Sequence, residues 1–322
     1  MKRMWTTGIR LGVMVVALIA ASGVLGQTYP TKPLRIVVGF PPGGGTDAVA
    51  RLLAPKLTAL LGQSVIIDNR PGAETNLANE YVARATPDGY TLLLTTGAIV
   101  INMSLYDKVE YDAIRDFAPI SLVAASPLVV VAGPALPVKT LKELLDTAHA
   151  KPGQLNYSSA GGPQRLAAEL FKVRTKTDLV NVPYKGSGPA ITALIGGEVQ
   201  LSFSNIPTVI QQAKAGRLRV LGVAARARSA LMPDVATLQE QGVDMDAAVW
   251  YGLLTPAATP KGVVRRLSET TETALRANDI RERLMNMGAE PVGSTPDAFA
   301  KQLRTEVKQW AEVVRLSGAK PN

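Results

Sequence analysis

The residues with the clearest chemical potential form a glycine-rich loop near the start of the predicted mature chain. An apolar run ends at Phe40 and leads into Pro41-Pro42-Gly43-Gly44-Gly45, after which Thr46 or Asp47 is predicted to open a helix. Such a loop leaves free backbone N–H groups at a helix N-terminus, where the positive end of the helix dipole favours an anion. The Lys-Ser/Thr pair of a P-loop and the GxGxxG spacing of a dinucleotide site are both missing. The loop therefore predicts an anion site without the parts for phosphoryl transfer.

Three further loops have the same character, because each follows an apolar strand pattern and opens a helical one. They comprise residues 69–76, 158–163 and 183–189. Each offers backbone donors or small hydroxyl groups at a helix N-terminus. Any one of them is typical of an ordinary turn, but together they predict two groups of loops that converge on a small anion.

Residues that could support catalysis are few. His149 is the only histidine, and it is predicted to end a helix, where a cation favours the dipole. The sequence contains no cysteine and no HExxH, EF-hand or Gly-x-Ser-x-Gly pattern, so we expect no metal and no cofactor. Ser187 has no identifiable base to activate it. This inventory favours a binding protein, and an exported hydrolase that uses the same cleft is the alternative.

The first 26 residues have the pattern of an export signal. Lys2, Arg3 and Arg10 precede a short apolar run that ends near residue 25, and cleavage after Gly26 is expected. An uncleaved membrane anchor is the alternative, but a run of about 15 residues is short for a span of about 20. Without cysteine, neither a lipid anchor on an N-terminal cysteine nor a disulfide can form. We therefore predict a periplasmic protein that is not inserted in the membrane after cleavage.

Strand and helix patterns alternate along the rest of the chain. The predicted strands are residues 34–40, 64–68, 90–95, 120–132, 155–159, 179–183, 199–204, 218–224 and 250–255. The predicted helices are residues 46–61, 76–85, 141–150, 163–172, 189–196, 207–215, 263–278 and 297–317. Near-continuous runs of Val, Ile and Leu that alternate with helices favour parallel sheets covered on both faces.

The predicted strand 120–132 is too long for one position in a sheet, and Pro127 interrupts it. A second crossing is expected near Trp250. Two crossings predict an α/β fold of the two-lobed periplasmic binding protein type, in which each lobe is a mostly parallel sheet flanked by helices. Lobe I would comprise residues 27–126 and 248–322, and lobe II residues 127–247, with ligand held in the cleft between them. One large doubly wound sheet is the alternative.

The charge of the chain is compatible with an anionic ligand. The full sequence carries a formal charge of +9, of which three positive charges belong to the predicted signal. The densest basic cluster, residues 217–228, contains four arginines and is interpreted as a solvated surface. Because basic residues are scattered and aromatic residues few, we expect no nucleic-acid partner.

The ordered motifs together resemble the Bug-type extracytoplasmic solute receptors, the substrate-binding components of tripartite tricarboxylate transporters. The similarity extends from about Tyr29 to Gly318. It is carried by the segments Tyr29-Pro30-Thr31-Lys32-Pro33, Phe40 to Asp47, Asn69-Arg70-Pro71-Gly72-Ala73, Pro87-Asp88-Gly89-Tyr90, Pro183-Tyr184-Lys185-Gly186, Gly196-Gly197-Glu198-Val199 and Trp250-Tyr251-Gly252-Leu253. The resemblance implies a monomeric receptor that closes on a small organic carboxylate and delivers it to membrane transporter subunits, or alternatively to a sensor kinase.

The resemblance also implies which residues hold the ligand. One carboxyl group would be bound by backbone groups and ordered waters of the first loop, and the serine-glycine loop of lobe II would face it. The matching residues are Pro42, Gly43 and Gly44, with Ser158, Ser159, Ala160 and Gly161 opposite, and Thr96 and Asn205 as further candidates. Phe40 or Trp250 would supply apolar wall, or serve as ordinary core residues.

Three departures from the family pattern bear on specificity. Arg165 follows the second loop where a histidine is common, and it could pair with a second ligand carboxylate or face solvent. Asn205 stands where an aspartate is common, which removes a negative charge. Glu74 and Thr75 replace a small, glycine-rich pair and could narrow the cleft or add a polar contact.

Overall fold

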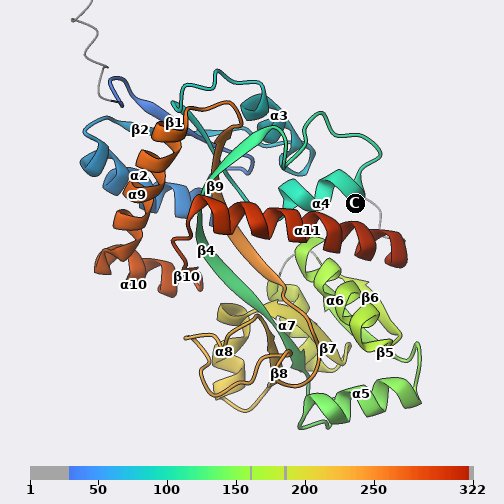
Figure 1. Ribbon diagram of the computed structural model, residues 1–322. Coiled ribbons are helices and arrows are strands. Elements are labelled where there is room, and N and C mark those ends of the chain that lie inside the picture. The colour runs from blue at the N-terminus through green and yellow to red at the C-terminus, as the bar shows by residue number, and fades with distance from the viewer. Residues whose placement is uncertain (1–28, 160–161, 185–186, 319–322) are drawn as a thin grey trace, which may run out of the picture.

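The computed structural model describes residues 29–159, 162–184 and 187–318. The predicted signal peptide lies outside this part of the chain, as do Ala160 and Gly161 of the predicted site. The described chain folds into two α/β halves, which we call lobe I and lobe II, drawn above and below each other in Figure 1. Every predicted strand and every predicted helix corresponds to an element of this fold.

Lobe I is built on three parallel strands, with β1 (Leu34–Val38) between β2 (Val65–Asn69) and β3 (Thr91–Thr95). Buried Val, Leu and Ile side chains make β1 and β3 suitable for a sheet covered on both faces. The covering helices include α2 (Gly45–Leu61), α3 (Asn76–Ala83) and α9 (Lys261–Arg276). The carboxyl ends of parallel strands meet at one edge of a sheet, so the loops after the three strands lie together there.

Lobe II repeats this arrangement. Its strand β5 (Leu155–Ser159) lies between β6 (Leu179–Pro183) and β7 (Leu201–Asn205), and all three are parallel. The helices of this lobe are α5 (Leu141–Ala150), α6 (Gly162–Thr175), α7 (Ser187–Gly196) and α8 (Ile206–Lys214). Helices α6 and α8 begin directly after β5 and β7, so their N-termini lie at the same edge of the lobe II sheet.

Two long strands connect the lobes. Strand β4 (Phe117–Ala132) pairs with β9 (Ala248–Pro256) as far as Pro127, and with β7 and β8 (Arg219–Ala224) from Leu128 onward. The prediction that Pro127 interrupts this strand was wrong. The proline stands where one set of partner strands ends and the next begins, so the N–H that it lacks falls between two ladders. The lobe limits near residues 127 and 248 stay a prediction.

Four short elements were not foreseen, and they lie mostly around lobe I. They are η1 (Ala73–Thr75), α4 (Ala98–Leu105), α10 (Asn278–Asn286) and β10 (Glu290–Pro291). Helix α4 escaped prediction because its sequence AIVINMSL is apolar almost throughout, and a buried helix of this kind has no polar face to give a 3.6-residue period.

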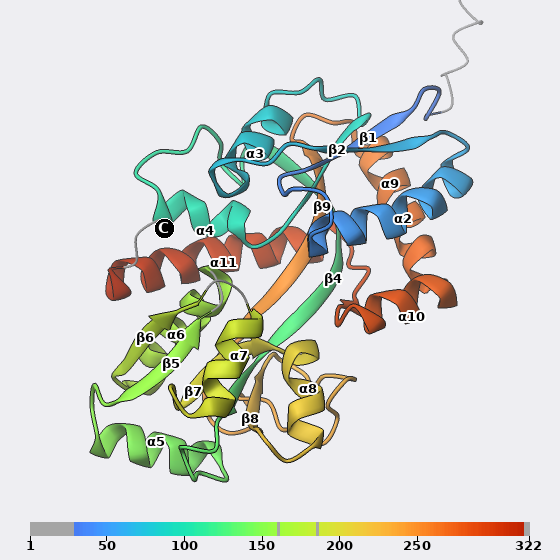
Figure 2. The same ribbon diagram turned by 180° about the vertical axis from the view of Figure 1, so that it is seen from behind.

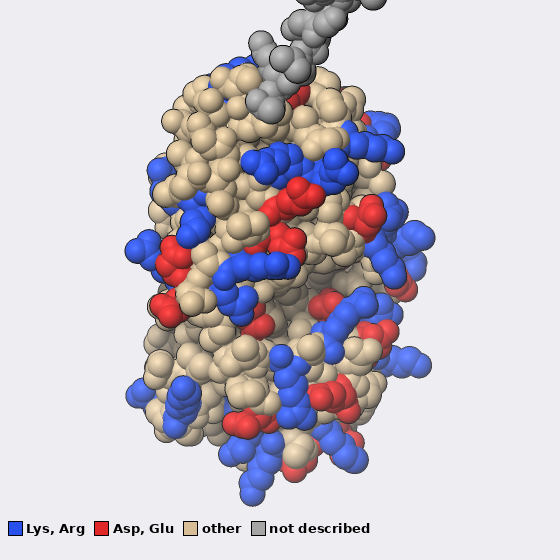
Figure 3. All heavy atoms as spheres, turned by 60° about the vertical axis from the view of Figure 1, so that its left-hand side comes forward, with Lys and Arg blue, Asp and Glu red and all other residues tan. Residues whose placement is uncertain are grey.

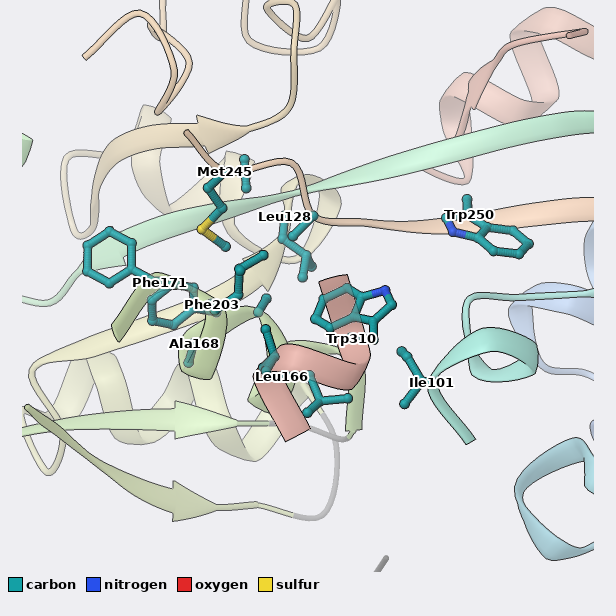
Figure 4. Close-up of a cluster of buried hydrophobic side chains, with 14 of the residues drawn as sticks. Ile101, Leu128, Leu166, Ala168, Phe171, Phe203, Met245, Trp250 and Trp310 are labelled. Atoms are coloured by element: carbon teal, nitrogen blue, oxygen red, sulfur yellow. The ribbon is translucent and has the colours of Figure 1, made fainter. Parts of the chain in front are cut away.

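The last helix, α11 (Pro296–Ser317), runs across both lobes on the side facing the viewer in Figure 1. Its Trp310 packs in a buried cluster that also contains Ile101 and Trp250 on the lobe I side and Leu166 and Phe203 of lobe II (Figure 4). One apolar core therefore continues between α11 and the crossing strands from one lobe to the other.

Candidate functional site

The loop between β1 and α2 is held in shape by one buried carboxylate. Asp47 is 2 % exposed, and its carboxylate accepts hydrogen bonds from the Gly43 N–H at 2.9 Å, Arg51 Nε at 2.8 Å and Asn69 Nδ2 at 2.9 Å. The hydrogen bond from Arg51 contributes most to lowering the pKa of Asp47 to about 2, so the group is charged at neutral pH. Asp47 thus fixes the loop from inside and leaves its outer surface free.

The outer surface of this loop presents backbone donors. Helix α2 begins at Gly45, with Gly44 as its N-cap and no side-chain cap. Across the described residues, the N–H groups of Gly44, Gly45 and Thr46 make no hydrogen bond. Pro42, Gly43 and Gly44 are all exposed. The loop therefore has free N–H groups at a helix N-terminus, while anion binding by them stays a prediction. The helix begins at Gly45, two residues before Asp47, whose carboxylate holds the loop instead of capping the helix.

The two aromatic residues considered for the apolar wall differ in burial, and a wall role for Phe40 stays a prediction. Phe40 is half-buried at the edge of the lobe I core, and its carbonyl oxygen accepts a 3.0 Å hydrogen bond from Asn69 Nδ2. Trp250 is 2 % exposed and packs edge-to-face on Phe299, with 5.4 Å between ring centroids. Trp250 is therefore a core residue.

Tyr251 is a site candidate that sequence reasoning missed. A Cβ built on Gly45 would lie 3.0 Å from the Tyr251 hydroxyl, so this phenol sits against the first turn of α2. Burial raises the pKa of Tyr251, which keeps the hydroxyl protonated. No hydrogen bond of this hydroxyl is present in the described part of the chain, so it can donate to a ligand beside the free N–H groups. The alternation of side chains along β9 could have revealed it, because Trp250 points into the core and its neighbour must point to the other face.

The second loop of lobe I is strained. Ala73, Glu74 and Thr75 have φ values of 44°, 47° and 79°, in the left-handed region that favours glycine. Asn102 Nδ2 holds the turn by donating to the Glu74 carbonyl oxygen at 2.8 Å, and Asn79 Nδ2 donates to Thr75 Oγ1 at 3.3 Å. Thr75 also lies directly against Gly39, since a Cβ at Gly39 would be 2.7 Å from its Cβ. Retained strain at this edge of the sheet is typical of a functional segment.

In lobe II, the predicted residues lie where β5 and β7 end. Ser158 and Ser159 are buried, and Ser158 Oγ has no hydrogen-bond partner in the described part of the chain. Asn205 Oδ1 accepts from Gln164 Nε2 at 3.1 Å, and Asn205 Nδ2 donates to Ser126 Oγ at 3.2 Å. This chain of amide and hydroxyl groups ties the starts of α6 and α8 to the crossing strand β4. Ala160 and Gly161, between these elements, lie outside the described residues.

Arg165 is half-buried near the first turn of α6. Its Nε is buried and has no partner among the described residues, and no ion pair of its guanidinium is present there. Arg165 therefore has one buried N–H donor, at Nε, whose hydrogen bond is not made within the described chain. The lone ion pair of α6 joins its neighbours Glu169 and Lys172 instead, at 3.0 Å, so Arg165 is not committed to Glu169.

Thr96 occupies the base of the interlobe region. Its Oγ1 accepts from the Ala98 N–H at 3.4 Å and so helps to start α4. Together with Pro163, Trp250 and Glu306 it lines a cavity of about 20 Å³, enough for a single water molecule. Thr96 therefore lies at the junction of the lobes, but its hydroxyl already accepts a hydrogen bond from the first turn of α4.

The two groups of loops face each other without touching. Figure 2 shows the start of α2 opposite the starts of α7 and α8, and Figure 3 shows a recess across the middle of the molecule between the two halves. No hydrogen bond or ion pair joins Pro42–Gly45 to Ser158, Ser159 or Asn205 in the described chain. The lobes do touch each other near β10. There Ser229 Oγ donates a hydrogen bond to the Glu290 carboxylate, and Gly288 packs on Pro207 at the start of α8.

The histidine considered for catalysis lies away from these loops. His149 is exposed, and its Nε2 lies 3.0 Å from the Thr175 carbonyl oxygen at the far end of lobe II helices α5 and α6. Among the described residues, no group of three or more His, Cys, Asp and Glu side chains could hold a metal ion. No helix in the described part of the chain has the length and apolar character needed to span a membrane.

A family model described as the tripartite tricarboxylate transporter family receptor matches residues 49–318. The chain belongs to this family. Among curated relatives, the receptor is 35 % identical to BugT of Bordetella pertussis over 315 residues, which cover 96 % of this chain and 97 % of BugT. The predicted resemblance to the Bug-type receptors is thereby confirmed.

Solved structures place the receptor among periplasmic binding proteins. It matches a TctC solute-binding protein from Polaromonas without ligand at a TM-score of 0.83 and 25 % identity, covering 89 % of this chain and 99 % of that one. It matches Rpa4515 of R. palustris with adipate at a TM-score of 0.72 and 34 % identity, covering 91 % and 100 %. The predicted two-lobed fold is thus confirmed.

Proposed function

We propose that this receptor binds a small dicarboxylate in the cleft between its lobes and delivers it to a membrane transporter. The observation that carries the proposal is the first turn of α2, where the N–H groups of Gly44, Gly45 and Thr46 and the Tyr251 hydroxyl have no hydrogen-bond partner in the described chain. One carboxylate of the ligand would be bound there. The relative Rpa4515 is described with adipate, a dicarboxylate, which supports this ligand class.

The second carboxylate would be bound by lobe II. Near the starts of α6 and α8, Arg165 supplies a cation and Ser158 a hydroxyl donor. Arg165 Nε and Ser158 Oγ both lack a hydrogen-bond partner in the described chain. Asn205, with Gln164 and Ser126, would fix the position of these helix starts. A ligand with two acidic ends would then bridge the lobes, whereas a monocarboxylate would satisfy one lobe only.

Closure of the lobes would accompany binding. The described chain is more similar in backbone to the ligand-free Polaromonas structure than to the adipate complex, although its sequence is less similar to the former. Because backbone similarity ordinarily rises with sequence identity, this order supports an open arrangement of the lobes. The ligand would stabilise the closed form through contacts made only there.

Export and partners follow from the same role. We propose that residues 1–26 are a cleaved signal that directs the receptor to the periplasm, where it acts as a monomer. The family name supports transporter subunits as the partner rather than a sensor kinase.

A thermal-shift screen of purified receptor against mono-, di- and tricarboxylates tests the proposal. A dicarboxylate at 100 times its Kd should stabilise the fold by about 2.7 kcal/mol, which raises Tm by about 5 °C or more. Chromatography after incubation should return the compound unchanged. Conversion of the compound would instead favour the hydrolase, and the absence of a shift with every carboxylate would refute the proposed ligand class.

A further inference from the structure

The basic cluster at residues 217–228, interpreted from sequence as a plain solvated surface, divides into two parts in the fold. Arg226 pairs with Asp246 at 3.0 Å, and Arg228 pairs with Glu240 at 3.0 Å. Arg217 and Arg219 are exposed and form no ion pair among the described residues. Arg217 and Arg219 thus differ from Arg226 and Arg228 in having no acidic partner among the described residues, so their charges are free to bind another molecule.

Both unpaired arginines line a groove at the end of lobe II away from the cleft. The groove has a volume of about 760 Å³, and its walls come from the loop after β4, the end of α8, the start of β8 and residues 231–235. Lys139 and Lys214, which are exposed and also unpaired in the described chain, lie on the same rim. Asp234 is the one acidic residue among the described lining, so the rim is strongly positive.

The floor of this groove is apolar. It is made by the side chains Leu136, Val138, Ile210, Val220, Leu231 and Met232. The groove is also firmly built, since a Cβ at Gly133 would lie 2.5 Å from the Leu194 carbonyl oxygen and the loop after β4 therefore packs closely on α7. An apolar floor inside a charged rim is the anatomy of a protein interface.

The groove is separate from the ligand cleft. Helix α8 starts at the cleft, beside Asn205, and ends with Lys214 on the groove rim. A nine-residue helix at 1.5 Å per residue places the two sites about 13 Å apart along its axis. Figures 1 and 2 both place α8 and β8 at the end of the molecule opposite β1 and β2.

We propose that this groove is the docking site for an acidic, partly apolar segment of a partner protein. The inference rests on the proposed receptor role, because a receptor must contact another protein to hand on its ligand. Glutamate or aspartate side chains of the segment would pair with Arg217, Arg219 and Lys214, while apolar side chains fill the floor. A concave groove with a recessed apolar floor suits such a segment better than a flat membrane surface, which could reach the rim only.

Fluorescence anisotropy with a short labelled peptide that alternates glutamate and leucine tests the proposal. The peptide should bind the mature protein, and binding should weaken as salt is raised. In the double variant Arg217→Glu and Arg219→Glu the affinity should fall by about tenfold or more. The double variant Lys139→Glu and Lys214→Glu, on other parts of the rim, should show the same loss. A matched control, Arg265→Glu with Arg266→Glu, makes the same charge change on exposed residues of α9 and should bind as the unaltered protein does.

Equal peptide binding by both groove variants and the control would overturn the proposal. So would a groove-dependent interaction with phosphatidylglycerol vesicles without peptide binding, because the partner would then be a membrane. If the protein binds a second equivalent of small dicarboxylate and the groove variants lose this binding, the groove is a small-ligand site and the docking proposal is wrong. Thermal shift with dicarboxylates is measured on the same samples, so failure of the cleft ligand and failure of the docking site are distinguishable.

Discussion

Trp250 Nε1 donates to both carboxylate oxygens of Glu306, at 3.0 and 2.9 Å. Gln302 Nε2 and Trp310 Nε1 donate to the same carboxylate at 2.8 and 3.4 Å. Burial raises the pKa of Glu306, while these three donors oppose the rise by favouring the charged form. The hydrogen bonds join the crossing strand β9 to α11, which spans both lobes. The junction about which the lobes would close therefore contains a hydrogen-bonded group centred on Glu306, surrounded by apolar core residues.

Ligand binding should change the tryptophan fluorescence of the receptor. Trp250 and Trp310 are the two tryptophans of the described chain, and both donate to Glu306 at the lobe junction. Closure would alter the packing around both indole rings, so the emission maximum or intensity should shift with saturation. Titration with the dicarboxylate found by thermal shift measures this, and the Trp310→Phe variant assigns the signal. An unchanged spectrum under conditions where calorimetry reports saturation would argue against closure at this junction.

Gly44→Leu should abolish ligand binding without unfolding the protein. Gly44 has φ −78°, which any residue can adopt, and a Cβ there would have only an ordinary contact, 3.7 Å from the Pro41 carbonyl oxygen. A leucine side chain would occupy the space above the free N–H groups. Losing two charge-assisted hydrogen bonds would weaken binding by about 100-fold or more. Calorimetry measures the affinity, and Gly262→Leu, in the first turn of α9 with open space around it, serves as the control that should bind normally.

Tyr251→Phe should weaken binding by about tenfold and leave stability unchanged, because the hydroxyl contributes a hydrogen bond only when ligand is present. Affinity comes from calorimetry and stability from thermal melting. Tyr29→Phe is the matched control. The Tyr29 hydroxyl donates to the Gly89 carbonyl oxygen at 2.6 Å, so its loss should lower Tm and spare ligand affinity. A drop in Tm for Tyr251→Phe with unaltered affinity would place its hydroxyl in the fold instead of the site.

Asp47→Ala should destabilise the receptor by about 2 kcal/mol, because it removes the acceptor of the hydrogen bonds donated by the Gly43 N–H and by Asn69 Nδ2, which keeps only its bond to Phe40. The effect should depend on pH. The folded pKa is about 2 and the reference value 3.8, so the stabilisation by Asp47 is present above pH 3.8 and is lost as pH falls toward 2. Chemical unfolding of both proteins between pH 2 and 7 checks this.

A constant difference between the two proteins across that pH range would contradict the role given to the Asp47 charge. Asp68→Ala is the control, because Asp68 forms partly exposed ion pairs with Arg35 and Arg70 at 3.1 and 2.9 Å. Exposed pairs of this kind contribute about 0–1 kcal/mol, so the control should be much milder.

Glu74→Gly should raise stability by about 0.5–1 kcal/mol. Glu74 has φ 47°, a conformation that costs an L-residue roughly 1–2 kcal/mol and glycine little, while glycine loses somewhat more entropy on folding. Ligand affinity should also change, because the segment lies against Gly39 beside the first loop. Lys176→Gly, at φ 55° in lobe II, should raise Tm alike with no effect on the ligand. Equal affinities for both variants would remove the Glu74 segment from the site.

The order of elements could be predicted from sequence because each element has a local signal. Runs of Val, Ile and Leu marked β1, β3 and β4, and proline-glycine loops marked the helix starts at which we propose an anion site. The departures from the family pattern at Arg165, Asn205 and Glu74 could also be read from the sequence, because each stands within or beside a recognisable motif. The N-terminus of α2 was placed one or two residues late, since Asp47 has the composition of an N-cap but serves as a brace.

What the sequence determined by itself was therefore the family, the two-lobed α/β order and the glycine-rich anion loop, all of which depend on neighbouring residues. The tertiary structure decided which distant groups meet. Tyr251 reaches the start of α2 across about 200 positions, and Glu306 joins Trp250. Arg226 and Arg228 find acidic partners in the fold, whereas Arg217 and Arg219 form no ion pair among the described residues. Local pattern carries no information on such pairs, because contact between them arises only when both lobes and α11 are packed.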